Sequence, residues 1–176
     1  MVWVNEWFSS PKETEGAISL MNAGADVLAH NTNSPAVLKA AQERGKRAVG
    51  YNSDMSSFAP KAHLASGQIN WAPYYIKTIG DVLEGKPVGN KMAWWGVKED
   101  SIDIVSIAAD VPAETKAKVA EVKAGLKDGS FKIFKGPLKD NAGKEQIKAG
   151  EAADDKFLGG MMFYVAGVEG SIPGAK

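Results

Sequence analysis

Residues 47–60, RAVGYNSDMSSFAP, decide the fold that the sequence predicts. They run from a short apolar strand, residues 47–51, into a polar loop that presents Asp54 and ends at Pro60. In parallel α/β domains, ligands bind at loops that follow the carboxyl ends of strands. The stretch therefore predicts one wall of a small-molecule cleft, with other strand-end loops gathered around it.

The sequence before this stretch repeats a strand-loop-helix unit. Each of the first two expected helices begins with Ser-Pro, with the serine as N-cap, and ends at a glycine: Ser10-Pro11 to Gly24, and Ser34-Pro35 to Gly45. The expected strands are residues 1–6, 26–30, 47–51 and 63–69, and a further helix carries Ile76, Ile79 and Leu83 on one face. Such units predict an α/β fold, with a flavodoxin-like parallel sheet, right-handed crossovers and flanking helices.

The pattern becomes less regular after residue 90, so we expect a domain of residues 1–90 followed by a tail of residues 91–176. In the tail, residues 92–97, 102–107 and 131–134 have the composition of strands, and residues 136–152 that of a polar hairpin. A helix bearing Val119, Val122 and Leu126 lies between them. A last helix starts at Asp154 and bears Phe157, Leu158, Met161, Met162 and Val165.

Composition narrows the function classes. The chain has 21 Lys and Arg against 21 Asp and Glu, so no overall basic charge predicts binding to nucleic acid. It has no cysteine, which excludes disulfides, thiolate metal sites and cysteine nucleophiles. With only His30 and His63 as histidines, we expect neither a metal site nor a cofactor.

Asp54 is the best single polar candidate, and we expect its neighbour Met55 to contact the ligand as well. A carboxylate beyond a strand end can accept hydrogen bonds from hydroxyl or amino groups of a ligand. The alternative is a turn or helix-capping aspartate, because the surrounding serines are typical of such turns.

Aromatic side chains follow other expected strands: Trp7, Phe8 and Trp71. They could stack on a flat ligand, at roughly a kcal/mol per ring pair. Packing in the core is the ordinary use of an aromatic residue, and the sequence leaves the two uses open.

Residues 30–34, HNTNS, bring the amides of Asn31 and Asn33 to the same sheet edge, where they could read the edge of a heterocycle. The segment also suits helix capping by Ser34, and His30 by itself suits a structural role. Lys98 follows residues 94–97, WWGV, and could meet an anionic or hydroxylated ligand, although an exposed lysine is the common case.

No phosphate-binding glycine loop, nucleophile elbow, zinc-helix motif or calcium loop occurs in the chain. Glu6 and Asp54 could be paired as hydrolytic carboxylates, but nothing marks Glu6 as special. We therefore expect no enzyme. One rival interpretation from another class stays open: a receiver-like signalling domain phosphorylated on Asp54.

Five segments resemble one family in order and spacing: VWVNEWFSSPKE, GADVLAHNTNSPAVLKAAQERG, AVGYNSDMSSFAPKAHLAS, NWAPYYIKTIGDVLEGK and WWGVKED. This is the basic membrane protein family, substrate-binding proteins of ABC importers with the type I periplasmic-binding fold. The resemblance continues through FKIFKGPLKDNAGK to the final helix.

The resemblance implies two α/β lobes that close on a purine nucleoside or a purine base such as adenine. It implies that residues 1–90 are the second lobe and that residues 91–176 are crossover strands, a helix and a C-terminal tail that would dock on the missing first lobe. An enzyme that processes nucleosides stays open as an alternative. The full-length protein would then be periplasmic, or a lipoprotein anchored at the outer face of the bacterial inner membrane. Its partners would be an ABC permease, the missing first lobe, and a second copy paired through the exposed lobe surface.

The resemblance also carries over to single residues. Asp54 matches an acidic residue that holds the ligand in nucleoside-binding members, and Trp7, Phe8 and Trp71 match aromatic positions at the cleft. Asn33 departs from the family, because it stands where an aspartate is expected in an HTDSP-like pattern. This departure argues against carboxylate recognition of the ligand by residues 30–34.

Overall fold

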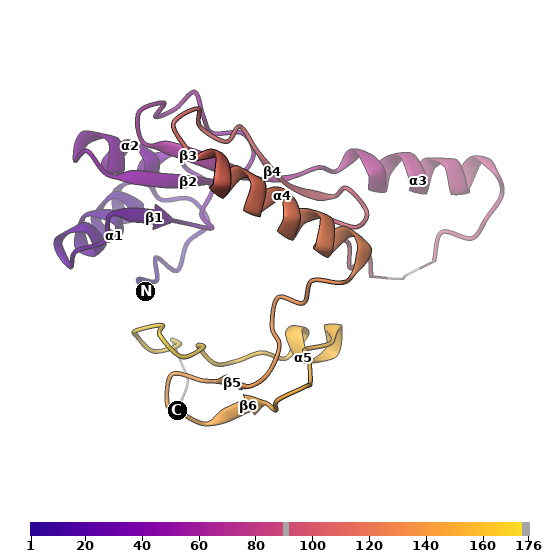
Figure 1. Cartoon of the computed structure of the whole chain (residues 1–176). Helices are drawn as coiled ribbons and strands as arrows, with labels where there is room; N and C mark the ends of the chain where they lie inside the picture. Colours follow the sequence, from indigo (N-terminus) through magenta and orange to yellow (C-terminus); the bar gives the residue numbers. More distant parts are fainter. Residues whose placement is uncertain (90–91, 174–176) are drawn as a thin grey trace. The chain divides into compact units, whose positions relative to one another are not determined.

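The computed structural model describes residues 1–89 and 92–173, and these residues form two compact units. The larger unit is Val4–Asp128, and the smaller one joins Met1–Trp3 to the chain from Gly129 onward (Figure 1). The expected division into residues 1–90 and 91–176 concerns the role of each part in a longer protein, and it stays a prediction.

The larger unit is an α/β sandwich built on one sheet, in the order β1-β2-β3-β4. The first three strands are parallel, which confirms the expected fold class, and β4 runs antiparallel to β3. The elements of this unit are α1 (Ser10–Asn22), β1 (Val27–Ala29), α2 (Ala36–Glu43), β2 (Arg47–Asn52), β3 (His63–Ile69), α3 (Ala72–Leu83), β4 (Ile102–Val105) and α4 (Ala113–Asp128).

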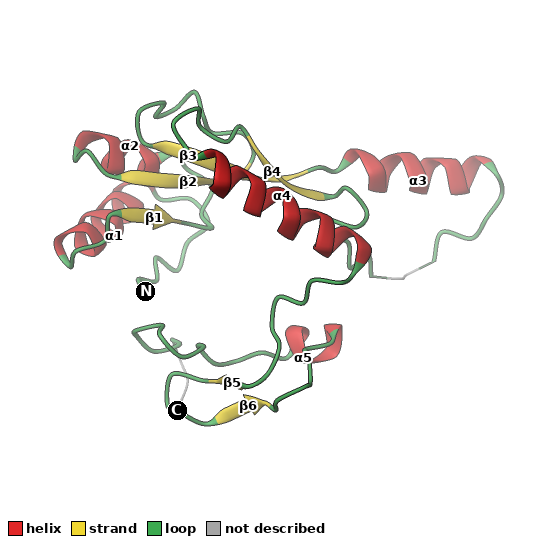
Figure 2. Ribbon diagram, in the orientation of Figure 1, coloured by secondary structure: helices red, strands yellow, loops and turns green. Residues whose placement is uncertain are grey.

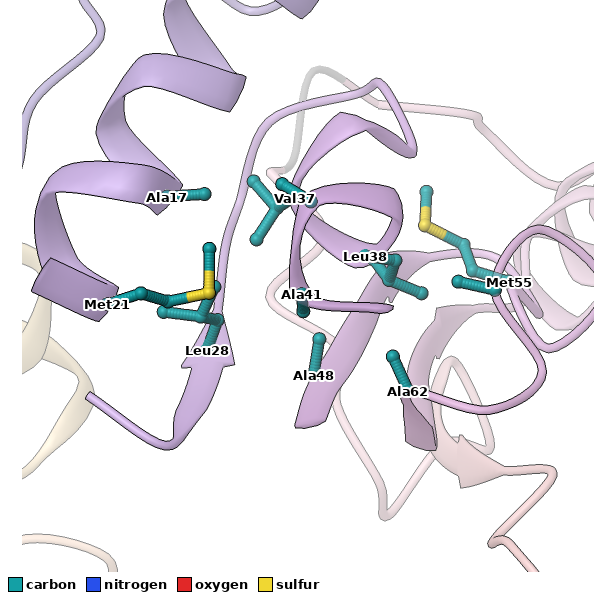
Figure 3. Close-up of a cluster of buried hydrophobic side chains, with 11 residues drawn as sticks. Ala17, Met21, Leu28, Val37, Leu38, Ala41, Ala48, Met55 and Ala62 are labelled. Atoms are coloured by element: carbon teal, nitrogen blue, oxygen red, sulfur yellow. The ribbon is translucent and has the colours of Figure 1, made fainter. Parts of the chain in front are cut away.

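The core lies between the sheet and the helices α1 and α2 (Figure 3). Leu38 of α2 is 0% exposed and is the largest side chain that the unit buries completely. Most of its neighbours are alanines, so helix and strands approach closely with few large side chains between them. The buried hydrophobic cluster is Ala17, Met21, Leu28, Val37, Leu38, Ala40, Ala41, Ala48, Met55, Ala59 and Ala62.

The loop after β2 folds back onto the sheet because Gly50 leaves room for it. A Cβ at Gly50 would lie 2.4 Å from the Ser66 hydroxyl oxygen and 2.9 Å from the Met55 Cβ. The Ser66 hydroxyl accepts a hydrogen bond from the Met55 amide at 3.0 Å and contacts the His63 ring at 2.7 Å. Glycine is therefore required at this position by close approach.

The smaller unit has little regular structure, as Figure 2 shows. Its hairpin pairs β5 (Leu138–Lys139) with β6 (Glu145–Ile147), which confirms the hairpin expected within residues 136–152. The helix α5 (Asp155–Gly159) begins where expected, since the Asp154 carboxylate accepts a hydrogen bond from the Phe157 amide at 2.7 Å. It ends at Gly159, so Met161, Met162 and Val165 lie beyond the helix, contrary to expectation.

The expected strand at residues 1–6 is wrong. Its apolar residues suggest a buried strand, but Val2 and Trp3 are exposed. Met1 and Trp3 instead bond within the smaller unit, to the Glu169 carbonyl and the Tyr164 hydroxyl. Tertiary contacts here override a local β-pattern.

Two further expected strands are wrong within the described residues: 92–97 and 131–134 form no strand. Both are short apolar runs whose backbone finds no partner strand, and a strand exists only as part of a ladder. Residues 102–105 do form a strand, because β3 offers them a free edge.

The first helix starts one residue earlier than expected, with Ser9 as N-cap. Pro35 occupies the N-cap position of α2, and the Ser34 hydroxyl still accepts a hydrogen bond from the Ala36 amide at 3.2 Å.

Helix α3 lies away from the sheet, as Figure 1 shows, and its Tyr74 ring makes an edge contact with the ring of Trp95, with centroids 5.7 Å apart. None of its residues is buried, and Ile76 is 71% exposed. Tyr75, Ile76, Ile79, Val82 and Leu83 form an exposed apolar stripe, which we call the α3 face. A stripe at helical spacing is typical of a helix that packs on another surface.

Two leucine-sized truncations should separate the core from the α3 face. We expect Leu38→Ala to lower the free energy of unfolding by about 2–5 kcal/mol, because it leaves a cavity in a packed interior. Ile76→Ala, which removes an exposed side chain of the same size, should change it by no more than about 0.5 kcal/mol. Urea denaturation followed by circular dichroism measures both, and equal losses would contradict this description of the core.

Candidate functional site

Two loops meet where the carboxyl end of β1 approaches the start of α1. One is the segment of residues 4–9, which carries Trp7 and Phe8 and which we call the aromatic loop. The other is residues 30–34, which we call the amide loop. The Asn33 amide donates a hydrogen bond to the Trp7 carbonyl oxygen at 2.7 Å. Trp7 and Phe8 are 68% and 66% exposed, so their rings are free to contact another molecule.

A buried carboxylate lies beneath these loops. Glu13, in the first turn of α1, accepts hydrogen bonds from the Ser9 amide at 3.0 Å, the Thr32 hydroxyl at 2.8 Å and the Ser34 hydroxyl at 2.7 Å. Burial raises the pKa of Glu13, but these hydrogen bonds outweigh it and hold the pKa below its usual value. The group is therefore ionised at neutral pH.

His30 extends this network toward β2. Its Nδ1 lies 3.3 Å from the Thr32 hydroxyl, and its ring makes an edge contact with the ring of Tyr51, with centroids 6.4 Å apart. Burial lowers the pKa of His30, which keeps the ring neutral at physiological pH. Its Nε2 is buried and has no hydrogen-bond partner among the described residues.

Asp54 is exposed and held by two serines. Its carboxylate accepts hydrogen bonds from the Ser106 hydroxyl and from the Ser56 amide, the latter at 2.9 Å. The Ser106 bond, followed by those of Ser56, lowers the pKa of Asp54 to about 2. The Ser56 bond makes Asp54 a turn aspartate, as the alternative to a ligand-binding role predicted. The carboxylate is nevertheless exposed, which a contact with a ligand would require.

Two residues beside Asp54 have backbone conformations that side chains rarely adopt. Asn52, the last residue of β2, has φ 72°, and Ser106, directly after β4, has φ 52°. Asparagine tolerates this region better than serine does. Strained backbone of this kind is common at ligand sites, where the surrounding structure compensates its cost.

The remaining candidates lie apart from this network. Met55 is buried in the core rather than exposed to a ligand. Trp71 is exposed directly before α3, and its ring lies 6.4 Å from that of Tyr75. Asn31 and Lys98 are exposed. Among the described residues, no hydrogen bond or ring contact joins Trp71 or Lys98 to the aromatic loop or to Asp54.

Sequence reasoning missed Glu13, Tyr51 and Ser106. Glu13 carries a local signal, because Ser10 and Glu13 have the spacing of a capping box. Ser106 carries none, since it lies far from Asp54 along the chain and only β4 pairing brings it near.

The described residues contain no cluster of three or more histidine, cysteine or acidic side chains that could hold a metal ion. In the same part of the chain, no helix is both long enough and apolar enough to cross a membrane. The groups that the two loops present are the exposed rings of Trp7 and Phe8 and the exposed amides of Asn31 and Asn33.

The larger unit is thus an α/β domain with exposed aromatic and amide groups beside the carboxyl end of β1. Residues 1–133 match the family described as "ABC transporter substrate-binding protein PnrA-like". The chain belongs to this family, Bmp, which confirms the resemblance found in the sequence.

Curated relatives match along nearly the whole chain. A purine-binding protein of Brucella abortus is 39% identical over 173 residues, 98% of this chain and 49% of the relative. A putative ABC transporter glucose-binding protein of Haloferax volcanii is 31% identical over 173 residues, 97% of this chain and 41% of the relative. The chain thus spans half or less of the length of these relatives, both of which are named as binding proteins.

Solved structures share the fold at low identity. A transcriptional activator of the comK gene from Bacillus halodurans aligns with a TM-score of 0.65 at 18% identity, over 73% of this chain and 46% of that one. A solute-binding protein of an ABC transporter system from Conexibacter woesei aligns with a TM-score of 0.60 at 18% identity, over 75% of this chain and 45% of that one. Both likenesses concern the fold.

The Ser106 hydrogen bond should control the ionisation of Asp54. We expect Ser106→Ala and Ser106→Gly to raise the pKa of Asp54 from about 2 toward the ordinary value of about 3.9. Because folding lowers this pKa, the ionised carboxylate stabilises the fold above about pH 3.9, and that contribution is lost as the pH falls toward the folded-state value. Carboxyl carbon NMR shifts against pH give the pKa in each protein.

The two substitutions also test the backbone strain. Both remove the hydroxyl, but only glycine relieves the left-handed conformation, so Ser106→Gly should unfold at a higher temperature than Ser106→Ala. An unchanged pKa in both variants would show that Ser106 does not hold Asp54 in solution.

Proposed function

We propose that this chain supplies the ligand-holding half of a solute-binding protein that serves an ABC importer and binds a purine base or nucleoside. The observation that carries the proposal is the exposed pair Trp7 and Phe8, fixed by a backbone hydrogen bond beside the amide loop. Membership of the Bmp family supports it, as does the relative named as purine-binding. The function is non-catalytic, which sets it apart from the receiver-like and nucleoside-processing interpretations.

In this proposal, the base stacks on Trp7 and Phe8, which offer flat apolar area at little conformational cost. Asn31 and Asn33 read the polar edge of the base with their side-chain amides, and neutral His30 lines the same wall. Asp54, ionised and exposed, accepts hydrogen bonds from ligand hydroxyl or amino groups. Trp71 and Lys98 approach the ligand from the end of β3 and from residues 94–98.

The second wall of the cleft comes from a first lobe outside this chain, because the chain spans about half of its relatives. Closure of the two lobes on the ligand is the change that the permease senses. The full-length protein acts in the periplasm, or as a lipoprotein at the outer face of the inner membrane. One wall buries only part of a ligand, so the chain alone binds weakly.

Adenine titration of the chain tests the ligand. We expect a saturable change in tryptophan fluorescence with a dissociation constant weaker than about 1 μM, because one wall cannot bury the base. Trp7→Ala should weaken binding by about tenfold or more, the loss of one stacking contact. Trp3→Ala, which removes an exposed tryptophan of the smaller unit and none of the proposed contacts, serves as the control.

Two results would contradict the proposal. Submicromolar affinity of the chain alone for adenine or a nucleoside would contradict the claim that the chain forms only one wall of the cleft. Equal loss of affinity in the two tryptophan variants would contradict the claim that the base stacks on Trp7. Glucose and adenosine complete the comparison, since one relative is named as a putative glucose-binding protein. If glucose changes the fluorescence and neither adenine nor adenosine does, the ligand is a sugar and not a purine.

We propose that the α3 face docks on the first lobe in the full-length protein and pairs with a second copy when that lobe is absent. An exposed stripe of this kind favours association in water.

We expect light scattering after gel filtration to give a mass above 18.7 kDa for the chain. Ile76→Glu with Ile79→Glu should restore the single-chain mass, whereas Lys118→Glu on α4 should not. A monomeric parent chain would contradict the pairing.

A further inference from the structure

Glu13 stands out among the charged residues of the larger unit because its side chain is almost fully enclosed. It is 1% exposed, and none of the ion pairs of the described residues includes it. A buried carboxylate without a cation is costly unless hydrogen bonds replace the water that it loses. Capping the first turn of a helix does not require burial, so it does not explain why the Glu13 carboxylate is enclosed.

The hydrogen bonds to Glu13 come from both loops of the proposed site. The Ser9 amide, at the end of the aromatic loop, donates to Oε1. The Thr32 and Ser34 hydroxyls of the amide loop both donate to Oε2. The N-terminus of α1 adds its partial positive charge, which favours an anion in the first turn. One carboxylate thus joins two segments that are far apart in the sequence.

The joined loops are the ones that carry the exposed groups. The Asn33 amide bonds to the Trp7 carbonyl directly above this carboxylate network, and the Ser34 hydroxyl also accepts from the Ala36 amide that begins α2. The backbone that carries Trp7 and Asn33 is consequently tied to Glu13 through the neighbouring residues Ser9, Thr32 and Ser34.

We propose that Glu13 is a positioning residue for ligand binding: its buried carboxylate fixes the aromatic loop to the amide loop, so that Trp7 and Phe8 are preorganised for stacking. The effect on ligand binding rests on the proposed function, whereas the link that Glu13 makes between the two loops is a property of the chain without ligand. A site whose loops are held before the ligand arrives loses less entropy on binding.

The chemistry of the carboxylate makes the proposal specific. A glutamine at position 13 keeps one acceptor oxygen: if that oxygen faces Thr32 and Ser34, its N–H₂ group meets the Ser9 amide, which can only donate, and if it faces Ser9, both hydroxyls lose the oxygen to which they donate. At least one of the three donors then loses its bond, and a buried donor without a partner is costly. Thr32→Val removes one donor at nearly constant shape, and Thr32→Ser restores it.

Amide hydrogen exchange without ligand tests the fixation. We expect Glu13→Gln and Thr32→Val to raise exchange of the Ser9 and Asn33 amides by about tenfold or more. Thr32→Ser should restore slow exchange. Met21→Ala, which truncates a core residue farther along the same helix, should lower the melting temperature but leave the two loop amides protected relative to the rest of the unit.

Adenine titration of the same proteins tests the consequence. We expect Glu13→Gln and Thr32→Val to weaken adenine binding by about tenfold, and Met21→Ala to leave it unchanged below its melting temperature. Unchanged loop exchange in Glu13→Gln, or an equal rise in Met21→Ala, would overturn the proposal. Absence of adenine binding in the parent chain would refute the proposed ligand, and the exchange result would still decide whether Glu13 fixes the loops.

Discussion

The close approach of helix α2 to strands β1 and β2 is the constraint on which the larger unit depends. Leu38 fills the centre of this interface, and alanines surround it on the helix, the strands and the loop after β2. Interfaces of small side chains bring backbones near one another and tolerate few changes in volume. The loop after β2 approaches the sheet just as closely, so that position 50 requires glycine and the Met55 amide bonds to the Ser66 hydroxyl.

The same sheet is covered on one face only. Val27, Ile102 and Ile104 are exposed on the other face, and the α3 face is exposed as well. Helix α4 is held to the β4 region by ion pairs, Lys123 with Asp103 and Lys127 with Asp100. Such pairs contribute about 0–1 kcal/mol each at a surface. The unit therefore presents apolar side chains at its surface as well as in its core.

At the strand ends, polar groups serve two purposes that are easily confused. Glu13, Thr32 and Ser34 satisfy one another and face inward, so they define the shape of the loops. Trp7, Phe8 and Asp54 face outward and are available to a ligand. Ser106, whose hydroxyl bonds to Asp54, has a left-handed backbone conformation, and such strain is common at ligand sites.

Local patterns in the sequence determined the parallel β-loop-α units, the helix ends at Gly24 and Gly45, the strand at residues 63–69 and the family to which the chain belongs, because these depend on periodicity, capping and close neighbours. Only the tertiary structure decided the fate of residues 1–6, the burial of Met55, and the bonds of Glu13 to Thr32 and of Asp54 to Ser106. Apolar runs such as residues 92–97 become strands only where a partner edge is free, and a buried carboxylate is recognised only once its donors are in place. Both facts concern residues distant along the chain, which a local pattern does not record.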